Sequence, residues 1–272
     1  MHLVELGFYC GTACALCAQG RRPETESPGS FEALAVQVDR APVHETLAFI
    51  GGEPTRFDGL VGLVERARDR GVSRIVLKTH ARQLAEPGVA QRLATAGVTS
   101  LDVSLSGDSE PVHDYHTGVA GSFRQTVLGI RRARAARLEL GINVLVTRSN
   151  FRHLSGIVRV VHALGAQAVG LVLAQPLGAG RDDASRLVPD KRMVWPHLAR
   201  ALELARTLGL ASAAPDFELT SEHGLEHWFA GLGPAPPEPE NPSPDELAGR
   251  EALSASQPPS HFVHHTSPGA GW

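Results

Sequence analysis

The sequence predicts an α/β protein folded as a partial (β/α)6 barrel, followed by a C-terminal helical extension and a proline-rich tail. Short apolar or β-branched runs alternate with longer helical patterns through about the first 175 residues. Such a repeated strand–helix unit implies a parallel sheet with right-handed crossovers. The runs number six, fewer than the eight strands of a closed barrel, so we expect an open one.

The expected strands are the apolar runs His2–Phe8, Thr46–Ile50, Ser73–Thr79, Thr99–Ser104, Glu139–Thr147 and Ala168–Ala174. The expected helices between them are Ser30–Arg40, Asp58–Arg70, Glu86–Ala96, Ser122–Arg137 and Asn150–Leu164. Ser30, Asp58 and Asn150 suit helix N-caps, and Pro87 suits a first helical turn. Helix ends are expected at the glycines Gly71, Gly97 and Gly165.

The C-terminal third differs in composition from the rest of the chain. One more helix is expected at Asp190–Leu208, which places Leu198, Leu202, Ala205 and Leu208 on one face. Residues 234–244 then hold six prolines among acidic and small residues. We therefore expect a barrel domain with its helix at residues 1–210. We expect residues 211–272 to form an extension that is flexible from about residue 233.

Composition argues against a nucleic-acid or membrane partner. The formal net charge is -3, without the basic excess that either partner usually needs. No apolar run reaches the length of a membrane span, and the start, MHLVELGFYC, lacks the features of a signal peptide. We expect a cytoplasmic protein, whose thiols stay reduced.

All three cysteines lie in the segment Cys10-Gly-Thr-Ala-Cys14-Ala-Leu-Cys17, just after the first expected strand. An odd, clustered count in a reducing compartment favours a metal site over disulfides. Thiolates are the usual ligands of iron–sulfur clusters, and three of them would leave one iron of a four-iron cluster open. A closed zinc site would want a fourth Cys or His, usually with a second close pair, and no second CxxC follows. An open metal position indicates catalysis.

The spacing CxxxCxxC, with Leu16 before the last cysteine, resembles the cluster loop of the radical S-adenosylmethionine (SAM) superfamily. The resemblance continues over about residues 1–180. The segment FIGGEPT at residues 49–55 ends the second strand as the superfamily's GGEP motif does. The segment LDVSLSG at residues 101–107 resembles its SLDG segment, with Ser106 where Asp is common. The stretch from His113 to Phe123 resembles the segment that follows it.

The resemblance implies a 4Fe–4S cluster on Cys10, Cys14 and Cys17, with the SAM amine and carboxylate chelating the open iron. The reduced cluster would cleave SAM to methionine and a 5′-deoxyadenosyl radical, which abstracts hydrogen from an unidentified peptide or small-molecule substrate. An external reductant such as flavodoxin or ferredoxin is implied. Because every cysteine is in the first loop, we expect no C-terminal auxiliary-cluster (SPASM-type) domain. With a strand at residue 2, we expect no preceding domain.

The resemblance also implies roles for single residues of the GGEP segment. A Gly51-Gly52 turn lets backbone approach the SAM amine, because no Cβ intrudes. Glu53, followed by Pro54, would neutralise the ammonium or sulfonium charge. The alternative for this segment is a plain strand-to-helix turn.

Later strands carry further candidates for the SAM site. Ser104 would donate a hydrogen bond to the SAM carboxylate or ribose; its alternative is a polar strand end. Asn143 is a candidate ribose contact, and Val144 and Leu171 are candidates to pack on the adenine. For these last three, filling of the barrel core is the alternative.

One position departs from many relatives with peptide or protein substrates. They place Arg near position 117 to pair with the SAM carboxylate, and this chain has Thr117. The substitutes considered are Arg124, Lys78 and His80. The nearby His113, Asp114 and His116 either reach substrate or cap a helix.

Two rival functions stay open from the sequence. A non-catalytic iron–sulfur electron-transfer or sensor protein would bind no SAM, and the GGEP and SLSG segments would then have no purpose. A phosphate-binding barrel enzyme would need a glycine-rich loop after a late strand, for which Pro176-Leu-Gly178-Ala-Gly180 is a weak candidate.

Overall fold

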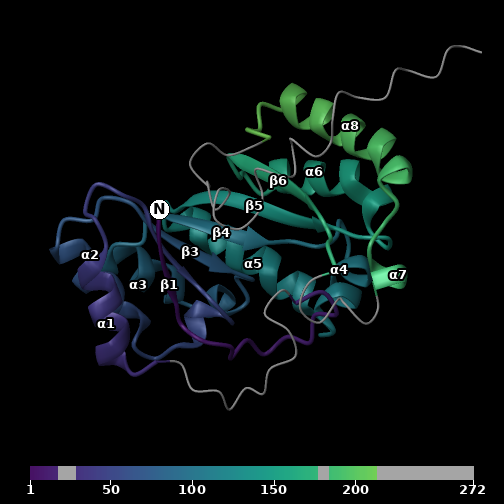
Figure 1. Cartoon of the computed structure of the whole chain (residues 1–272). Coiled ribbons are helices and arrows are strands. Elements are labelled where there is room, and N and C mark those ends of the chain that lie inside the picture. The colour runs from purple at the N-terminus through teal and green to yellow at the C-terminus, as the bar shows by residue number, and fades with distance from the viewer. Residues whose placement is uncertain (18–28, 177–183, 213–272) are drawn as a thin grey trace, which may run out of the picture. The chain divides into compact units, whose positions relative to one another are not determined.

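The fold is described by a computed structural model that covers residues 1–17, 29–176 and 184–212. Within these residues, six strands form one parallel sheet in the order β1-β2-β3-β4-β5-β6 (Figure 1). They are β1 (His2–Glu5), β2 (Leu47–Ile50), β3 (Ile75–Thr79), β4 (Ser100–Ser104), β5 (Glu139–Val146) and β6 (Ala168–Leu173). Because β1 and β6 do not pair with each other, the sheet stays open, which confirms the predicted partial barrel.

Helices connect successive strands, as parallel pairing requires. The helices are α1 (Phe31–Arg40), α2 (Leu60–Asp69), α3 (Val89–Ala96), α4 (Glu110–Thr117), α5 (Ser122–Ala135), α6 (Leu154–Ala163), α7 (Ala184–Leu187) and α8 (Lys191–Thr207). Short 3-10 turns add η1 (Pro54–Arg56), η2 (Gln83–Ala85) and η3 (Phe151–His153). Helix α1 packs on β1, α2 on β3 and α5 on β5.

Alternation along the strands gives the sheet two different faces. The helix face carries the largest buried side chains, among them Phe49, Leu77, Leu101 and Ile142. The other face, which we call the inner face, is apolar near the strand starts, where Leu3 packs against Ala48 and Val76. Toward the strand ends the inner face becomes polar. The carboxyl ends of all strands lie at one edge, where such folds place their chemistry.

The expected strands and helices are confirmed, most of them trimmed by one to three residues at an end. Ser30 caps α1 by accepting from the Ala33 N–H at 3.2 Å. The three expected glycines follow their helices with positive φ, namely Gly71, Gly97 and Gly165. These positions favour glycine because a Cβ is strained there.

Two helix-start predictions were wrong, and a third residue stands at its predicted N-cap position without a side-chain cap. Helix α2 begins after Gly59, with no side-chain cap from Asp58. Pro87 precedes α3, which begins at Val89. Asn150 is the N-cap residue of η3, but its buried side chain does not cap the turn: Oδ1 accepts from the Thr147 N–H three residues upstream at 2.7 Å, and Nδ2 donates to the distant Ser106 carbonyl at 2.9 Å. Tertiary partners thus replace the local cap.

The helix predicted at Asp190–Leu208 is confirmed as α8, with Asp190 capping it through the Arg192 N–H at 2.8 Å. Leu198 and Ala205 are buried on the face that meets α6. After α8, Ala211 pairs with β6 by accepting from the Val169 N–H at 2.9 Å. The proline-rich tail and the segment Gly178–Gly180 lie outside the described residues.

No helix in the described ranges has the length and apolar character to cross a membrane.

Candidate iron–sulfur and SAM site

The three cysteines lie on the loop that leaves the carboxyl end of β1. All three are free thiols and half-buried. The Thr12 hydroxyl lies 3.0 Å from the Cys10 sulfur and accepts from the Cys14 thiol at 3.5 Å. The loop backbone is held by the Ala13 N–H, which donates to the Thr117 carbonyl at 2.9 Å. One loop therefore presents the three sulfurs at the edge where the active sites of such folds lie.

Burial sets the protonation of two of these thiols. It raises the pKa of Cys10 to about 11, against an opposing hydrogen bond from Thr12. Burial also raises the pKa of Cys14, while the Thr12 hydrogen bond and the nearby Arg82 charge lower it. Both sulfurs thus hold their protons in the metal-free chain at neutral pH, and metal binding must release them.

The donor set fits an iron–sulfur cluster better than a single ion. No group of three or more His, Cys, Asp or Glu side chains in the described residues converges as a single-ion site. A cluster differs because each cysteine binds its own iron, so the sulfurs need not meet at one point. Three thiolates, with no fourth ligand converging on them among the described residues, are the set that a cluster with one open iron requires.

The GGEP segment is docked on the backbone that leads into the cysteine loop. Gly51 and Gly52 have φ values of +90° and +52°, which favour glycine. A Cβ on Gly51 would lie 2.9 Å from the Gly7 carbonyl oxygen, and one on Gly52 would lie 2.5 Å from the Tyr9 carbonyl oxygen. That same Tyr9 carbonyl accepts from the Glu53 N–H at 2.9 Å. Both glycines are thus needed for close approach to the β1 loop.

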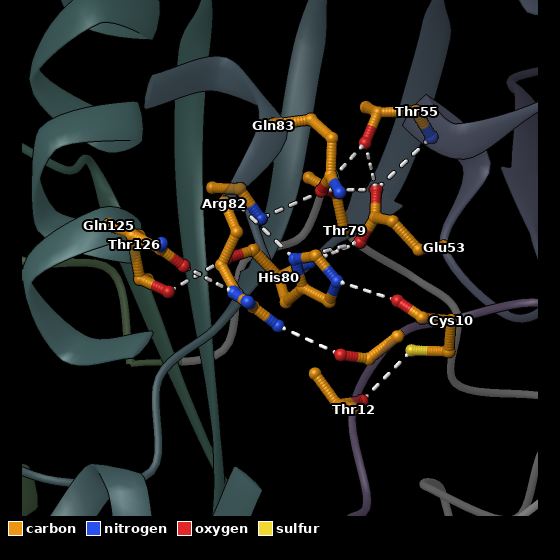
Figure 2. Close-up of polar contacts among 12 residues, drawn as sticks. Cys10, Thr12, Glu53, Thr55, Thr79, His80, Arg82, Gln83, Gln125 and Thr126 are labelled. Atoms are coloured by element: carbon orange, nitrogen blue, oxygen red, sulfur yellow. Dashed lines mark hydrogen bonds and ion pairs between the residues drawn. The ribbon is translucent and has the colours of Figure 1, made fainter. Parts of the chain in front are cut away.

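Glu53 has a buried carboxylate, 2% exposed, with hydrogen bonds to both oxygens (Figure 2). Oε1 accepts from the Thr55 N–H at 3.1 Å and from the hydroxyls of Thr55 and Thr79, each at 2.6 Å. Oε2 accepts from the His80 N–H at 2.8 Å. The carboxylate therefore ties the end of β2 to the end of β3. The buried Pro54 follows it at the first position of η1.

Two residues that follow β3 also contact the backbone of the cysteine loop (Figure 2). His80 Nε2 lies 3.2 Å from the Cys10 carbonyl oxygen, and Arg82 Nη1 donates to the Gly11 carbonyl at 3.0 Å. Since a carbonyl only accepts, the His80 proton in this contact must be on Nε2. His80 Nδ1 lies 3.2 Å from both the Arg82 N–H and Glu53 Oε2. It accepts from the amide when it carries no proton and can donate to the carboxylate only when protonated.

Ser104 and Asn143 come together on the inner face, where they are register partners on β4 and β5. Asn143 Nδ2 donates to Asp102 Oδ1 at 2.5 Å, which places Asp102 on the same face. Asp102 is 1% exposed, its Oδ2 has no hydrogen-bond partner among the described residues, and burial raises its pKa. Lys78 is exposed and is the register partner of Asp102 on β3. These residues form a polar row near the strand ends.

Val144 and Leu171, the candidates to pack on the adenine, lie on the opposite face of the sheet from this polar row. They are register partners on β5 and β6, and Val144 follows Asn143, so both side chains point to the helix face. Both are buried there. Leu16 is half-buried on the cysteine loop itself.

His113 and Asp114 both make hydrogen bonds to other residues of this chain. Asp114 caps α5 by accepting from the Gly121 N–H at 2.6 Å, the Phe123 N–H at 2.8 Å and the Ser122 hydroxyl at 2.7 Å. Burial alone would raise its pKa, but these hydrogen bonds lower it. His113 Nδ1 accepts from the Ser106 N–H at 3.1 Å, and burial lowers the pKa of His113 to about 4.

The side chains of Thr117 and His116 also form hydrogen bonds with other residues of the chain. The buried Thr117 hydroxyl lies 2.6 Å from that of Ser122, and His116 Nε2 lies 2.7 Å from the Thr147 hydroxyl. Arg124 points to Glu110, at 2.7 Å, on the exposed surface. Of the three basic residues considered for the SAM carboxylate, Arg124 and His80 therefore have protein partners, and Lys78 lies on the inner face.

Comparison with known proteins identifies the family to which this site belongs. The radical SAM superfamily profile matches residues 4–160. The chain belongs to the radical SAM superfamily. Members of this superfamily are enzymes, and membership confirms the predicted cofactors, a 4Fe–4S cluster and SAM.

Radical SAM relatives of several activities resemble the chain. An AdoMet-dependent heme synthase of Nitratidesulfovibrio vulgaris is 33% identical over 186 residues, 66% of this chain and 50% of the relative. A mycofactocin maturase of Mycobacterium ulcerans is 30% identical over 68% of this chain and 50% of its own. A PqqA peptide cyclase of Rhodopseudomonas palustris is 27% identical over 69% and 50%. The chain spans about half the length of the curated relatives it matches.

Solved structures show the same fold. Streptococcus suis SuiB bound to S-adenosylmethionine aligns with a TM-score of 0.61 at 14% identity, over 78% of this chain and 49% of that one. Native anSMEcpe with bound AdoMet aligns with a TM-score of 0.62 at 16% identity, over 77% of this chain and 62% of that one. At these identities the likeness supports the radical SAM barrel fold.

Sequence reasoning missed three residues that the structure brings to the site. Arg82 and Gln125, which bond each other at 2.7 Å, carry no motif. Asp102 had a usable signal: it stands two residues before Ser104, so it shares that residue's face, and it is a carboxylate inside a buried strand. The sequence offers His80 as a partner for the SAM carboxylate, whereas in the structure His80 contacts the Cys10 carbonyl.

Proposed function

We propose that this chain is a radical SAM enzyme whose Cys10, Cys14 and Cys17 hold the 4Fe–4S cluster and leave one iron for SAM. When bound, the cluster and SAM supply a 5′-deoxyadenosyl radical that abstracts hydrogen from substrate. The observation that carries this proposal is the docking of the GGEP turn on the cysteine loop. The Tyr9 carbonyl, one residue before Cys10, accepts from the Glu53 N–H and leaves no room for a Cβ on Gly52.

The chain's own residues would bind SAM across the strand ends. The backbone of the Gly51–Gly52 turn would approach the SAM amine, while Glu53 holds that turn against β3. Ser104 and Asn143, paired on the inner face, would hydrogen-bond the SAM carboxylate or ribose.

Lys78 is the basic residue that we assign to the SAM carboxylate. It lies exposed on the inner face, two residues beyond Val76, and its register partner is Asp102. Leu16 would shield the cluster from water on the loop side. Val144 and Leu171 are left out of the proposed adenine site because their side chains lie on the helix face.

The proposed substrate is a peptide or a small molecule, and a flavodoxin or ferredoxin is the proposed electron donor. Relatives named as a peptide cyclase and a maturase favour a peptide, while the heme synthase favours a small molecule. We further propose that residues 1–210 form the catalytic domain and residues 211–272 an extension without a cysteine-bound auxiliary cluster.

Electron paramagnetic resonance (EPR) of the anaerobically reconstituted, dithionite-reduced protein tests this function. SAM chelation of the open iron changes the surroundings of the cluster, so we expect the spectrum to change on addition of SAM. S-adenosylhomocysteine, which lacks the sulfonium charge, serves as the comparison ligand. A cluster that forms but gives the same spectrum with and without SAM would support the electron-transfer protein instead.

A further inference from the structure

The turn at the end of β3 is held by many contacts and contains an unfavourable backbone conformation. This turn, Thr79–Arg82, contains Ala81 at φ +60°, one of two non-glycine residues with positive φ in the described chain. Such a conformation is unfavourable for a residue with a side chain and persists only where the surroundings over-determine it. The Thr79 hydroxyl accepts from the Ala81 N–H at 2.9 Å, and Gly129 of α5 lies so close that a Cβ would overlap the Ala81 carbonyl.

Several fixed elements hold this turn. The Glu53 carboxylate accepts from the His80 N–H, and the Thr126 hydroxyl of α5 donates to the His80 carbonyl at 2.9 Å. The Arg82 Nε donates to Gln125 Oε1 at 2.7 Å, also on α5 (Figure 2). The His80 backbone and the Arg82 side chain are therefore anchored by residues of α5 and by Glu53, which lie outside the cysteine loop.

From this anchored position, two side chains reach adjacent carbonyls of the cysteine loop. His80 Nε2 meets the Cys10 carbonyl and Arg82 Nη1 meets the Gly11 carbonyl. His80 is 9% exposed, so its hydrogen bond is largely protected from competing water. The loop has no strand or helix between Cys10 and Cys17, and Gly11 has φ +72°. Contacts from elsewhere must therefore fix its path.

We propose that His80 and Arg82 are positioning residues that clamp the Cys10 and Gly11 carbonyls and so fix the first cysteine in place for the cluster. The proposal rests on the proposed function, because it assigns these carbonyls to a cluster-binding loop. Neither residue touches the reacting atoms in this role. Glu53 is the anchor behind the clamp, which gives the GGEP carboxylate a structural task in this chain.

A pair of His80 variants isolates the hydrogen bond from packing. The amide nitrogen of glutamine lies as many bonds from Cα as imidazole Nε2, so His80→Gln retains a donor that reaches the Cys10 carbonyl. His80→Asn places its amide where Nδ1 stands, too short for that contact. Arg82→Lys keeps the charge but loses the fork that bonds Gly11 and Gln125 together. The exposed Arg131→Ala on α5 is the control.

The first measurement uses the metal-free protein. Amide hydrogen exchange is followed in the peptide covering residues 9–17, where the Ala13 and Cys17 N–H groups are hydrogen-bonded. We expect exchange about tenfold faster in His80→Asn and Arg82→Lys, equivalent to about 1.4 kcal/mol, and little change in His80→Gln and Arg131→Ala. Equal exchange in the Gln and Asn variants would overturn the proposal, as would a loop that exchanges like an unfolded chain in the wild type.

The second measurement uses the reconstituted protein and an iron chelator under nitrogen. We expect His80→Asn and Arg82→Lys to release iron about tenfold faster than His80→Gln, with a broadened EPR spectrum of the reduced cluster. Identical release and identical spectra would contradict the clamp. A wild type that assembles no cluster, yet shows the expected exchange pattern, would refute the proposed function and leave the clamp standing as a property of the loop.

Discussion

The replacement of Gly52 by alanine probes the docking between the GGEP turn and the cysteine loop. Gly52 has φ +52°, and an added Cβ would lie 2.5 Å from the Tyr9 carbonyl oxygen and 2.9 Å from both the Tyr9 nitrogen and the Phe8 carbonyl carbon. All three are backbone atoms, so no side-chain rotation relieves the contact. The positive φ costs about 1 kcal/mol and the overlap about 1–3 kcal/mol more.

Gly71→Ala is the matched control for this substitution. Gly71 also has positive φ, +91°, but a Cβ there would meet no atom within 4 Å. The free energy of unfolding of Gly71→Ala should therefore fall only by the cost of the positive φ, about 1 kcal/mol. Urea unfolding of the metal-free proteins should show Gly52→Ala about 1–3 kcal/mol less stable than Gly71→Ala, at an unchanged m value.

The same substitution should also affect the metal site. Relief of the overlap must displace the Tyr9 backbone, which is bonded directly to Cys10. After anaerobic reconstitution, Gly52→Ala should retain less iron than Gly71→Ala. If the two variants unfold at the same urea concentration and bind equal iron, the close approach of the turn to the loop is not what the structure indicates.

Three further outcomes follow from the contacts of single residues. Cys10→Ala, Cys14→Ala and Cys17→Ala should each abolish the visible absorbance of the reconstituted cluster, since the chain has no spare cysteine; full iron content in any of them would remove that residue as a ligand. Burial holds the pKa of His113 at about 4, below 6.5, so the unfolded chain binds that proton first and stability falls as pH drops from 6.5 to 4. This loss in the free energy of unfolding amounts to about 3 kcal/mol. Urea titrations should show that it is missing in His113→Asn, which keeps the acceptor for the Ser106 N–H. If the wild type and the variant lost stability in parallel as the pH fell, the assignment to His113 would be contradicted. Asp114→Ala should lose about 2–3 kcal/mol with the cap of α5, whereas the exposed Asp69→Ala should change stability by less than about 0.5 kcal/mol; similar losses in both would refute the capping role.

Local signals predicted most of the fold. The six strands follow from short apolar runs, and the glycines at 71, 97 and 165 stop helices for a reason contained in one residue, its freedom to adopt positive φ. At Asn150 the side chain bonds a distant segment instead of capping, because its amide donates to the Ser106 carbonyl, and no local pattern records that choice. Asp58 is exposed, and α2 begins one residue later than predicted, after Gly59.

The candidate site was inferred from its sequence motifs, and the structure adds the residues that contact those motifs. The cysteine spacing and the GGEP segment are contiguous in sequence, so each could be recognised from one stretch. The clamp joins His80 to Cys10 and Arg82 to Gly11 across about 70 residues. The inner face was predicted only in part, because Asn143 is brought to Ser104 by strand register while Val144 is turned away from it by the alternation of the strand.

The most direct test of the account is whether the reduced protein cleaves SAM to 5′-deoxyadenosine. The reconstituted wild type and Cys14→Ala are incubated anaerobically with SAM and dithionite, and the quenched reactions are separated by chromatography. We expect 5′-deoxyadenosine and methionine in equal amounts from the wild type and none from the variant. A wild type with an intact cluster that yields no more 5′-deoxyadenosine than Cys14→Ala, with several reductants, would contradict the account.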